Sequence, residues 1–162
     1  MELSRLTALD RIGAQGALVD VEATGAELQA IAQRLDVPSV RQLGCTFRVR
    51  RIGPSLIEAQ GTLRGVVDQV CVISLETFTH ELQDAFTVHF VPSGTEDDDA
   101  EPDAVDQIPY EGSAIDLGEA TVEQLALALD PYPRKPGAIL SEAAQDGSTG
   151  PFAVLAGRSR LI

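Results

Sequence analysis

Aromatic residues are scarce in this chain: tryptophan is absent, and 4% of the 162 residues are aromatic. The core must therefore be built from leucine, valine, isoleucine and alanine, and few rings remain as stacking platforms. Cysteine is scarce as well, because the sequence contains only Cys45 and Cys71. Two cysteines cannot form a disulfide framework, so each is interpreted as a small, buried hydrophobic side chain.

Long hydrophobic runs are missing from the first stretch, MELSRLTALDR, in which charges are mixed with apolar residues. This pattern is not typical of a signal peptide or a membrane anchor. We therefore expect a cytoplasmic protein that has no membrane partner. The chain length suits one domain with a substantial core, and the hydrophobic content of 44% is ordinary for a globular protein.

Catalytic motifs are lacking too. The two histidines, His80 and His89, both fall in a predicted strand region, and neither has the neighbours of a catalytic triad. The phase of His89 relative to the apolar residues around it favours a solvent-facing strand position, and we interpret His80 in the same way. No nucleotide-binding glycine loop, HExxH or GxSxG pattern occurs. The sequence therefore predicts a protein that is not an enzyme and binds no cofactor or metal.

Basic residues are few: 12 lysines and arginines stand against 25 aspartates and glutamates, a net charge of −13. Residues 1–70 carry eight side chains of each sign, whereas residues 71–162 carry four basic and seventeen acidic ones. Binding to an RNA backbone draws on lysine and arginine, so this balance argues against broad RNA contact. It favours a basic protein partner, although an acidic surface that simply maintains solubility would explain the same charge.

The first helix is predicted by its cap. Thr24 and Glu27 have capping-box spacing, and an apolar stripe at residues 28–35 follows until Pro38 ends the helix. Residues 17–23 alternate like a short strand that leads into this helix. We expect the helix to cover a sheet face.

A long antiparallel hairpin is predicted next. Residues 43–50 and 57–68 both alternate between apolar and polar side chains, and the Gly53-Pro54-Ser55 turn joins them. Gly61 and Gly65 lie on the apolar side of the second strand, where they leave room for another element or for a bulge that curves the sheet. We therefore predict an α+β fold with a curved, mostly antiparallel, barrel-like sheet and two covering helices.

Residues 69–91 are interpreted as two strands with no catalytic constellation between them. Residues 93–107 contain the run Glu96 to Asp99 and predict an acidic flexible loop; calcium binding is the alternative, but the EF-hand ligand spacing is missing. A second capped helix is predicted to start at Asp116. The apolar arc of this helix is wide enough for it to be buried on two sides or to contact a partner. Asp130-Pro131 should end it.

Three segments make up the predicted organisation: a single β-rich domain at 1–133, a flexible tether at 134–149, and a C-terminal PFAVLA segment at 150–162. The last segment, with Phe152 and Leu155, either folds back onto the domain or docks on another protein. Tyr132, Pro133 and Arg134 place an aromatic ring and a cation on a stiff prolyl segment, which predicts an interaction hot spot. A helix stop that packs locally is the alternative.

A basic patch is the other candidate interface. Arg48, Arg50, Arg51 and Arg64 fall on adjacent predicted strands and would form an RNA-binding patch if their side chains gathered on one face. The alternative is solvated charge on the sheet face, balanced by Glu58 and nearby acids.

Three blocks carry a resemblance to a known family. They are QVCVISLETFTHELQDAFTVHFV at 69–91, IDLGEATVEQLALALDPYP at 115–133 and GPFAVLAG at 150–157. In their order along the chain and in their residue sequence, these blocks resemble the YceD family, the large ribosomal RNA subunit accumulation proteins. Many members carry a second cysteine three residues after the one that matches Cys71, where this chain has Ser74. A zinc or redox pair of that kind is therefore not expected here.

The resemblance implies a role in accumulation of large-subunit ribosomal RNA, and hence in assembly of the large ribosomal subunit. Combined with the acidic charge, it predicts a non-enzymatic factor that binds a basic ribosomal protein or the pre-ribosomal large subunit. Direct binding of RNA through the arginine patch remains the alternative function.

Overall fold

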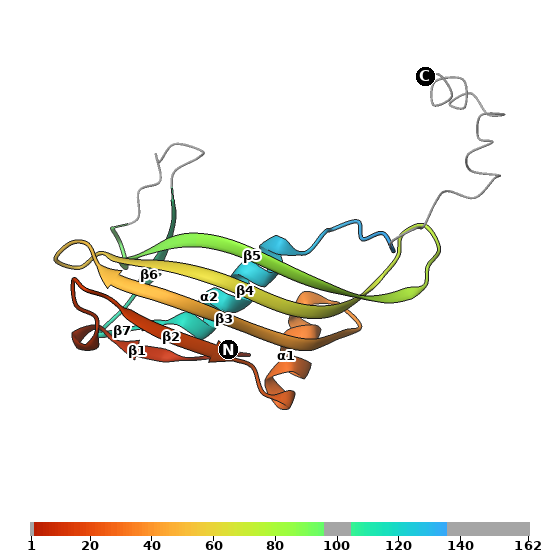
Figure 1. Ribbon diagram of the computed structural model, residues 1–162, viewed down its shortest axis with the longest axis horizontal. Coiled ribbons are helices and arrows are strands. Elements are labelled where there is room, and N and C mark those ends of the chain that lie inside the picture. Colours follow the sequence, from red (N-terminus) through yellow and green to blue (C-terminus); the bar gives the residue numbers. More distant parts are fainter. Residues whose placement is uncertain (1, 96–104, 136–162) are drawn as a thin grey trace, which may run out of the picture. The chain divides into compact units, whose positions relative to one another are not determined.

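The computed structural model describes residues 2–95 and 105–135 (Figure 1). It is an α+β structure with two α-helices and two sheets. In chain order its elements are β1 (Leu6–Ala8), a 3-10 turn (Leu9–Arg11), β2 (Ala17–Glu22), α1 (Gly25–Leu35), β3 (Ser39–Arg51), β4 (Ile57–Val70), β5 (Thr77–Pro92), β6 (Asp106–Tyr110), β7 (Ala114–Asp116) and α2 (Leu117–Ala128).

The chain divides into two compact units. The first comprises Met1–Gln69 and Thr79–Pro131 and holds both helices and nearly all of both sheets. The second comprises Val70–Phe78 and Tyr132–Ile162. Nearly all of the predicted tether at 134–149, and the whole segment at 150–162, lie outside the described residues.

The larger sheet has the strand order β2-β3-β4-β5-β6, and β1 pairs with β7 in a separate two-stranded sheet. β3 is antiparallel to both β2 and β4, as the predicted hairpin requires. β6 runs parallel to β5, which the sequence did not indicate. The predicted barrel is not confirmed, because neither sheet is closed or strongly curled. The order ends at two short strands, β2 and β6, that do not pair with each other.

One face of the larger sheet forms the core. Alternate residues of β3, from Leu43 through Cys45 and Phe47 to Val49, are all at most 1% exposed. Ile31 of α1 belongs to the same hydrophobic cluster, and so do the buried residues of α2. Both predicted helices are therefore present and pack on this one face, as Figure 1 shows.

The sequence analysis offered two roles for Gly61, room for another element or a bulge that curves the sheet, and the structure supports the first. It pairs with Phe47 across the hairpin, and the ring of Phe86 fills the space where a Cβ would stand. Phe47 and Phe86 meet edge to face, with ring centroids 5.7 Å apart. The glycine thus admits an aromatic ring. The irregularity in this hairpin lies elsewhere, between Val40 and Gln42 of β3.

Both helix starts are confirmed. Thr24 and Glu27 form the reciprocal capping box of α1, and the backbone N–H of Thr24 donates to Glu27 at 2.8 Å. The carboxylate of Asp116 accepts from the N–H groups of Gly118 and Glu119 at the start of α2. The Glu119 side chain forms an ion pair with Arg34 of α1, 2.7 Å away.

Two predicted boundaries were wrong. Residues 69–91 do not form two complete strands, because β4 ends at Val70 and Cys71 lies in the turn that leads to β5. The turn needs a left-handed residue, Leu75 at φ 61°, and alternation alone does not reveal such a position. The predicted acidic loop ends earlier than residue 107, since β6 begins at Asp106. Residues 96–104 of that loop lie outside the described residues.

The N-terminal segment is fastened to the start of α2. Arg5 donates its backbone N–H to Asp116 at 2.8 Å, and its carbonyl accepts from Leu117 at 3.0 Å. A Cβ built at Gly118 would lie 2.8 Å from both the Arg5 nitrogen and the Leu3 carbonyl oxygen. Because these contacts are with backbone atoms of residues 3–5, a side-chain rotation in that segment cannot make room for the added Cβ. Gly118 is therefore a packing requirement of this junction.

Replacing Gly118 by alanine should destabilise the protein, although alanine is the better helix former. We expect Gly118→Ala to lose about 1–3 kcal/mol of unfolding free energy through overpacking. Gly25→Ala is the matched control, since Gly25 opens α1 and has nothing within 4 Å of its Cβ position. It should be neutral or stabilising by up to about 1 kcal/mol. Urea denaturation compares the two, and equal stability of both variants would contradict this account.

Stability should also depend on pH through Glu27. The Arg5 guanidinium, followed by the Thr24 N–H, lowers the pKa of Glu27 from 4.5 to about 2. A carboxyl whose pKa is lower in the folded state stabilises the fold above pH 4.5, and that contribution disappears as the pH falls to about 2. Glu27→Gln keeps a capping-box residue but removes the ion pair with Arg5.

We therefore expect Glu27→Gln to be less stable than the native chain at neutral pH, and the difference in unfolding free energy to shrink as the pH falls through this range. Denaturant titrations at a series of pH values measure that difference. A difference that stays constant with pH would refute the ion-pair explanation.

Candidate functional site

The face of the larger sheet opposite the helices is called the open face. Strand register places its side chains, because Leu18 of β2 pairs with Arg48 and Thr46 of β3 pairs with Thr62 of β4. The face is polar and contains both signs of charge. Its side chains from β2, β3 and β4 include Leu18, Asp20, Glu22, Thr46, Arg48, Arg50, Glu58, Gln60, Thr62 and Arg64.

Three of the four patch arginines lie on the open face, and two of them are already bound to carboxylates. Arg50 forms an ion pair with Glu58 at 2.8 Å, and Arg64 forms one with Glu22 at the same distance. Arg48 is exposed and has no ion-pair partner in the described part of the chain. This mixture resembles the predicted solvated charge as much as a basic patch.

Arg51 points to the other side of β3. It pairs in register with the buried Ile57, and its guanidinium donates to the carbonyl oxygens of Leu9 at 2.6 Å and Ile12 at 3.3 Å. It therefore fastens the 3-10 turn to the sheet. The structure does not bring Arg51 together with the other three arginines.

Carboxylates are distributed differently from arginines. Glu81 and Asp84 of β5, Asp106 of β6 and Glu111 have no ion-pair partner among residues 2–95 and 105–135. All four are exposed. The sequence analysis missed Glu81 and Asp84 as candidates, although a strand that carries acids and no lysine or arginine was a usable signal.

Burial and like charge act on a further carboxylate, Glu123 of α2. Its pKa is raised, first by burial and then by the negative charge of Glu119. The described acids outside the ion pairs thus include residues of β5, β6 and α2, and in the first part of the chain Asp10, Asp20 and Asp36.

Asp68 is the most connected acid of the sheet. Arg41 lies at the β3 irregularity and bonds both carboxylate oxygens at 3.0 Å, and the Thr79 hydroxyl also donates to this carboxylate. Arg41 first, and then Thr79, lower the pKa of Asp68. A bulge re-aims a side chain in this way. Asp68 therefore has a structural role in joining β3, β4 and β5.

The two histidines lie on opposite sides of β5. His89 shares the open face with Glu58, 3.7 Å away, and its side chain is 22% exposed. This agrees with the predicted phase of His89. His80 is partly buried as well and forms a 2.6 Å hydrogen bond with Gln69 on the other side of the strand, so it does not share the open face with His89.

The cysteines are both buried, as predicted, but their surroundings differ. Burial raises the pKa of Cys45 to about 12. Cys71 lies in the turn between β4 and β5 and accepts a hydrogen bond from the Ser74 N–H at 3.4 Å. Bonding by Ser74 lowers the pKa of Cys71 to about 6. Within the described ranges, no group of three or more histidine, cysteine or acidic side chains could hold a metal ion.

The segment after α2 shows features of both interpretations given to it. Tyr132 is 72% exposed and Arg134 is exposed as well. The Pro133 carbonyl accepts from the Val72 N–H at 2.9 Å, and Lys135 lies 3.6 Å from Glu76. The hot spot stays a prediction, and its companions Phe152 and Leu155 lie outside the described residues.

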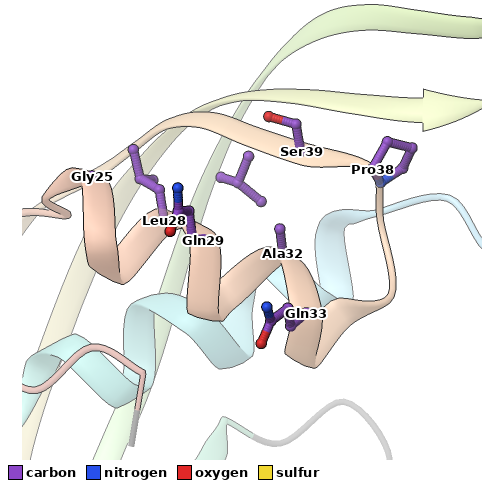
Figure 2. Close-up of a pocket in the computed structure, with 8 residues that line it drawn as sticks. Gly25, Leu28, Gln29, Ala32, Gln33, Pro38 and Ser39 are labelled. Atoms are coloured by element: carbon purple, nitrogen blue, oxygen red, sulfur yellow. The ribbon is translucent and has the colours of Figure 1, made fainter.

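A groove of ≈ 330 Å³ lies between α1 and the start of β3 (Figure 2). None of the eight residues that line it has an ionisable side chain: Gly25, Leu28, Gln29, Ala32, Gln33, Pro38, Ser39 and Val40. The groove therefore provides no acid, base or charged metal ligand of its own.

Among the described helices, none has the length and hydrophobicity needed to cross a membrane.

Comparison with known proteins connects this structure to one family. Residues 59–153 match the family model described as large ribosomal RNA subunit accumulation protein YceD. The match starts within β4, so it includes most of the second hairpin strand, the blocks at 69–91 and 115–133, and the start of the block at 150–157. No curated protein and no solved structure matches the chain. The family match covers more than half of the 162 residues, and the chain therefore belongs to the YceD family of large ribosomal RNA subunit accumulation proteins.

Proposed function

We propose that this protein is a non-enzymatic, cytoplasmic ribosome biogenesis factor that binds a basic ribosomal protein, free or within the pre-ribosomal large subunit. The family supplies the process, since its description concerns accumulation of large-subunit ribosomal RNA. The charges of the structure suggest the partner. Opposite charge steers the encounter of two proteins and disfavours partners of the same sign.

The observation that carries this proposal is the unequal use of the two charges. Arg5, Arg34, Arg41, Arg50 and Arg64 all form ion pairs with carboxylates of the same chain. Exposed acids on β5, β6 and the following turn have no such partner in the described part of the chain. A phosphate backbone would have to compete with a carboxylate for each of these five arginines, whereas Arg11, Arg48 and Arg134 are exposed and form no ion pair in the described part of the chain. A cationic protein would meet those exposed acids instead.

Shielding explains how such binding could favour accumulation of the RNA. A basic ribosomal protein binds nucleic acids without specificity through its lysines and arginines. An acidic factor that covers these side chains delays such contacts until the correct RNA competes for them. Each exposed ion pair between the two proteins contributes little binding free energy, so the complex can dissociate when the correct RNA competes.

The proposal predicts which molecules the chain binds. The tagged protein, purified at physiological salt, should recover one or more large-subunit ribosomal proteins, and nuclease treatment should not release them. Arg48→Ala removes the open-face arginine that has no ion-pair partner and should leave this binding unchanged.

Binding to large-subunit ribosomal RNA provides the contrary outcome. If the chain bound this RNA with an affinity that fell steeply as salt rose, and Arg48→Ala made that dependence on salt less steep, direct RNA binding would be the function instead of binding to a protein. Recovery of neither a ribosomal protein nor an assembly intermediate would refute the proposal as a whole.

Loss of the gene should lower the ratio of large to small ribosomal subunits on a density gradient, because large-subunit RNA that is not assembled fails to accumulate. Restoring the native chain should restore the ratio. A normal gradient in cells without the protein would contradict the proposed process.

A further inference from the structure

The strand β5 has a long unpaired edge. β5 comprises Thr77–Pro92, but β6 pairs only with its last part, from Val88 to Pro92. Within the described residues, Glu81–Thr87 therefore pair on one side alone, with β4. In Figure 1, β5 runs on beyond β6 as the outermost strand of the sheet. Such an edge presents backbone N–H and C=O groups on which another strand can pair.

Contacts with β4 show that this stretch is a well-formed strand. Leu82 lies over Gly65, with its Cδ1 3.4 Å from the ideal Cβ position, and Phe86 lies over Gly61. Both side chains pack against the core but remain only partly buried. A strand added beside β5 would extend their cover. A groove of ≈ 560 Å³ lies across β3, β4 and β5 and is lined by Gln42, Arg64, Gly65, Val66, Glu81, Leu82 and Gln83, so it belongs to the sheet surface and not to the free edge.

Charge indicates which strand would fit. Glu81 and Asp84 lie on opposite faces of β5 because they are separated by an odd number of positions. Both are exposed and neither has an ion-pair partner in the described part of the chain. Residues 81–87 contain no lysine or arginine. An incoming strand with cations on both of its faces would therefore meet a carboxylate on each.

A second copy of this chain is the less suitable occupant. Two β5 edges paired with each other would bring Glu81 and Asp84 of one copy near the same acids of the other. Like charges on paired strands are destabilising. Acidic side chains at an exposed edge are also a known protection against self-association of sheets. The edge is thus closed to copies of itself and open to a cationic strand.

We propose that the β5 edge, residues 81–87, binds an extended cationic segment of the partner by adding it as a further strand to the sheet. This inference rests on the proposed function, because a basic ribosomal protein would supply the segment. Backbone hydrogen bonds provide the affinity, and the carboxylates of Glu81 and Asp84 select a basic sequence.

The test uses the full chain and a synthetic peptide about ten residues long, a usual strand length, with lysines on both faces. Hydrogen exchange should show slower exchange within residues 81–87 when the peptide binds. Methylating the backbone nitrogens of alternate peptide residues removes donors while keeping the side chains. One of the two alternating methylation patterns should abolish binding, because a strand pairs through every second residue along one edge.

Glu81→Gln with Asp84→Asn should weaken peptide binding roughly threefold or more, as expected for the loss of two exposed ion pairs. Glu111→Gln is the matched control, an exposed acid away from the edge that also lacks a partner among the described residues, and it should change affinity less. Binding that tolerates both methylation patterns, or protection outside residues 81–87, would overturn the edge site. A dimer of the free chain protected at these residues would do the same.

The edge site and the proposed function fail separately. If cells yield a ribosomal protein that leaves exchange at residues 81–87 unchanged, the edge site is wrong and the function stands. If the peptide adds to the edge but no ribosomal protein or assembly intermediate is recovered, the site stands and its proposed partner is wrong.

Discussion

Burial of one sheet face is the constraint on which the rest of the structure depends. α1 and α2 both pack on the apolar side of the larger sheet, where Phe47, Gly61 and Phe86 fit together. Two helices of 11 and 12 residues do not cover the second side, so its strand residues must be polar. The open face and the β5 edge are consequences of this one-sided cover. They are also where the chain can meet another molecule.

The ion pairs determine where on the surface the excess negative charge of the chain lies. Arg41 at the β3 irregularity, Arg50 and Arg64 join neighbouring strands through Asp68, Glu58 and Glu22. Each exposed pair contributes little to stability. Their combined effect on the surface is larger, because they neutralise carboxylates around β3 and β4, whereas Glu81, Asp84 and Asp106 on β5 and β6 have no ion-pair partner in the described part of the chain. Net charge alone does not contain this asymmetry.

Local signals were predictable from the sequence, whereas pairings between distant residues were not. The α1 cap depends on two residues three positions apart, Thr24 and Glu27, and alternation identified the β3–β4 hairpin. The family was recognisable from short blocks. The open sheet was missed because Gly61 suits either curvature or a neighbouring ring. Parallel β6, whose polar DQIPY lacks alternation, depends on strand order, which no local pattern encodes. The acids of β5 could have been noted from the sequence, because that strand contains no lysine or arginine.

The pairing of β1 with β7 affects how the chain folds during synthesis. Leu6 lies opposite Asp116 and Ala8 opposite Ala114, so the first strand has its partner near the far end of the described fold. A ribosome adds residues one at a time, and β1 must wait as an unpaired segment until β7 has emerged. Long sequence separation between partners slows folding. The nascent chain therefore completes its fold late, with its N-terminal strand among the last parts to settle.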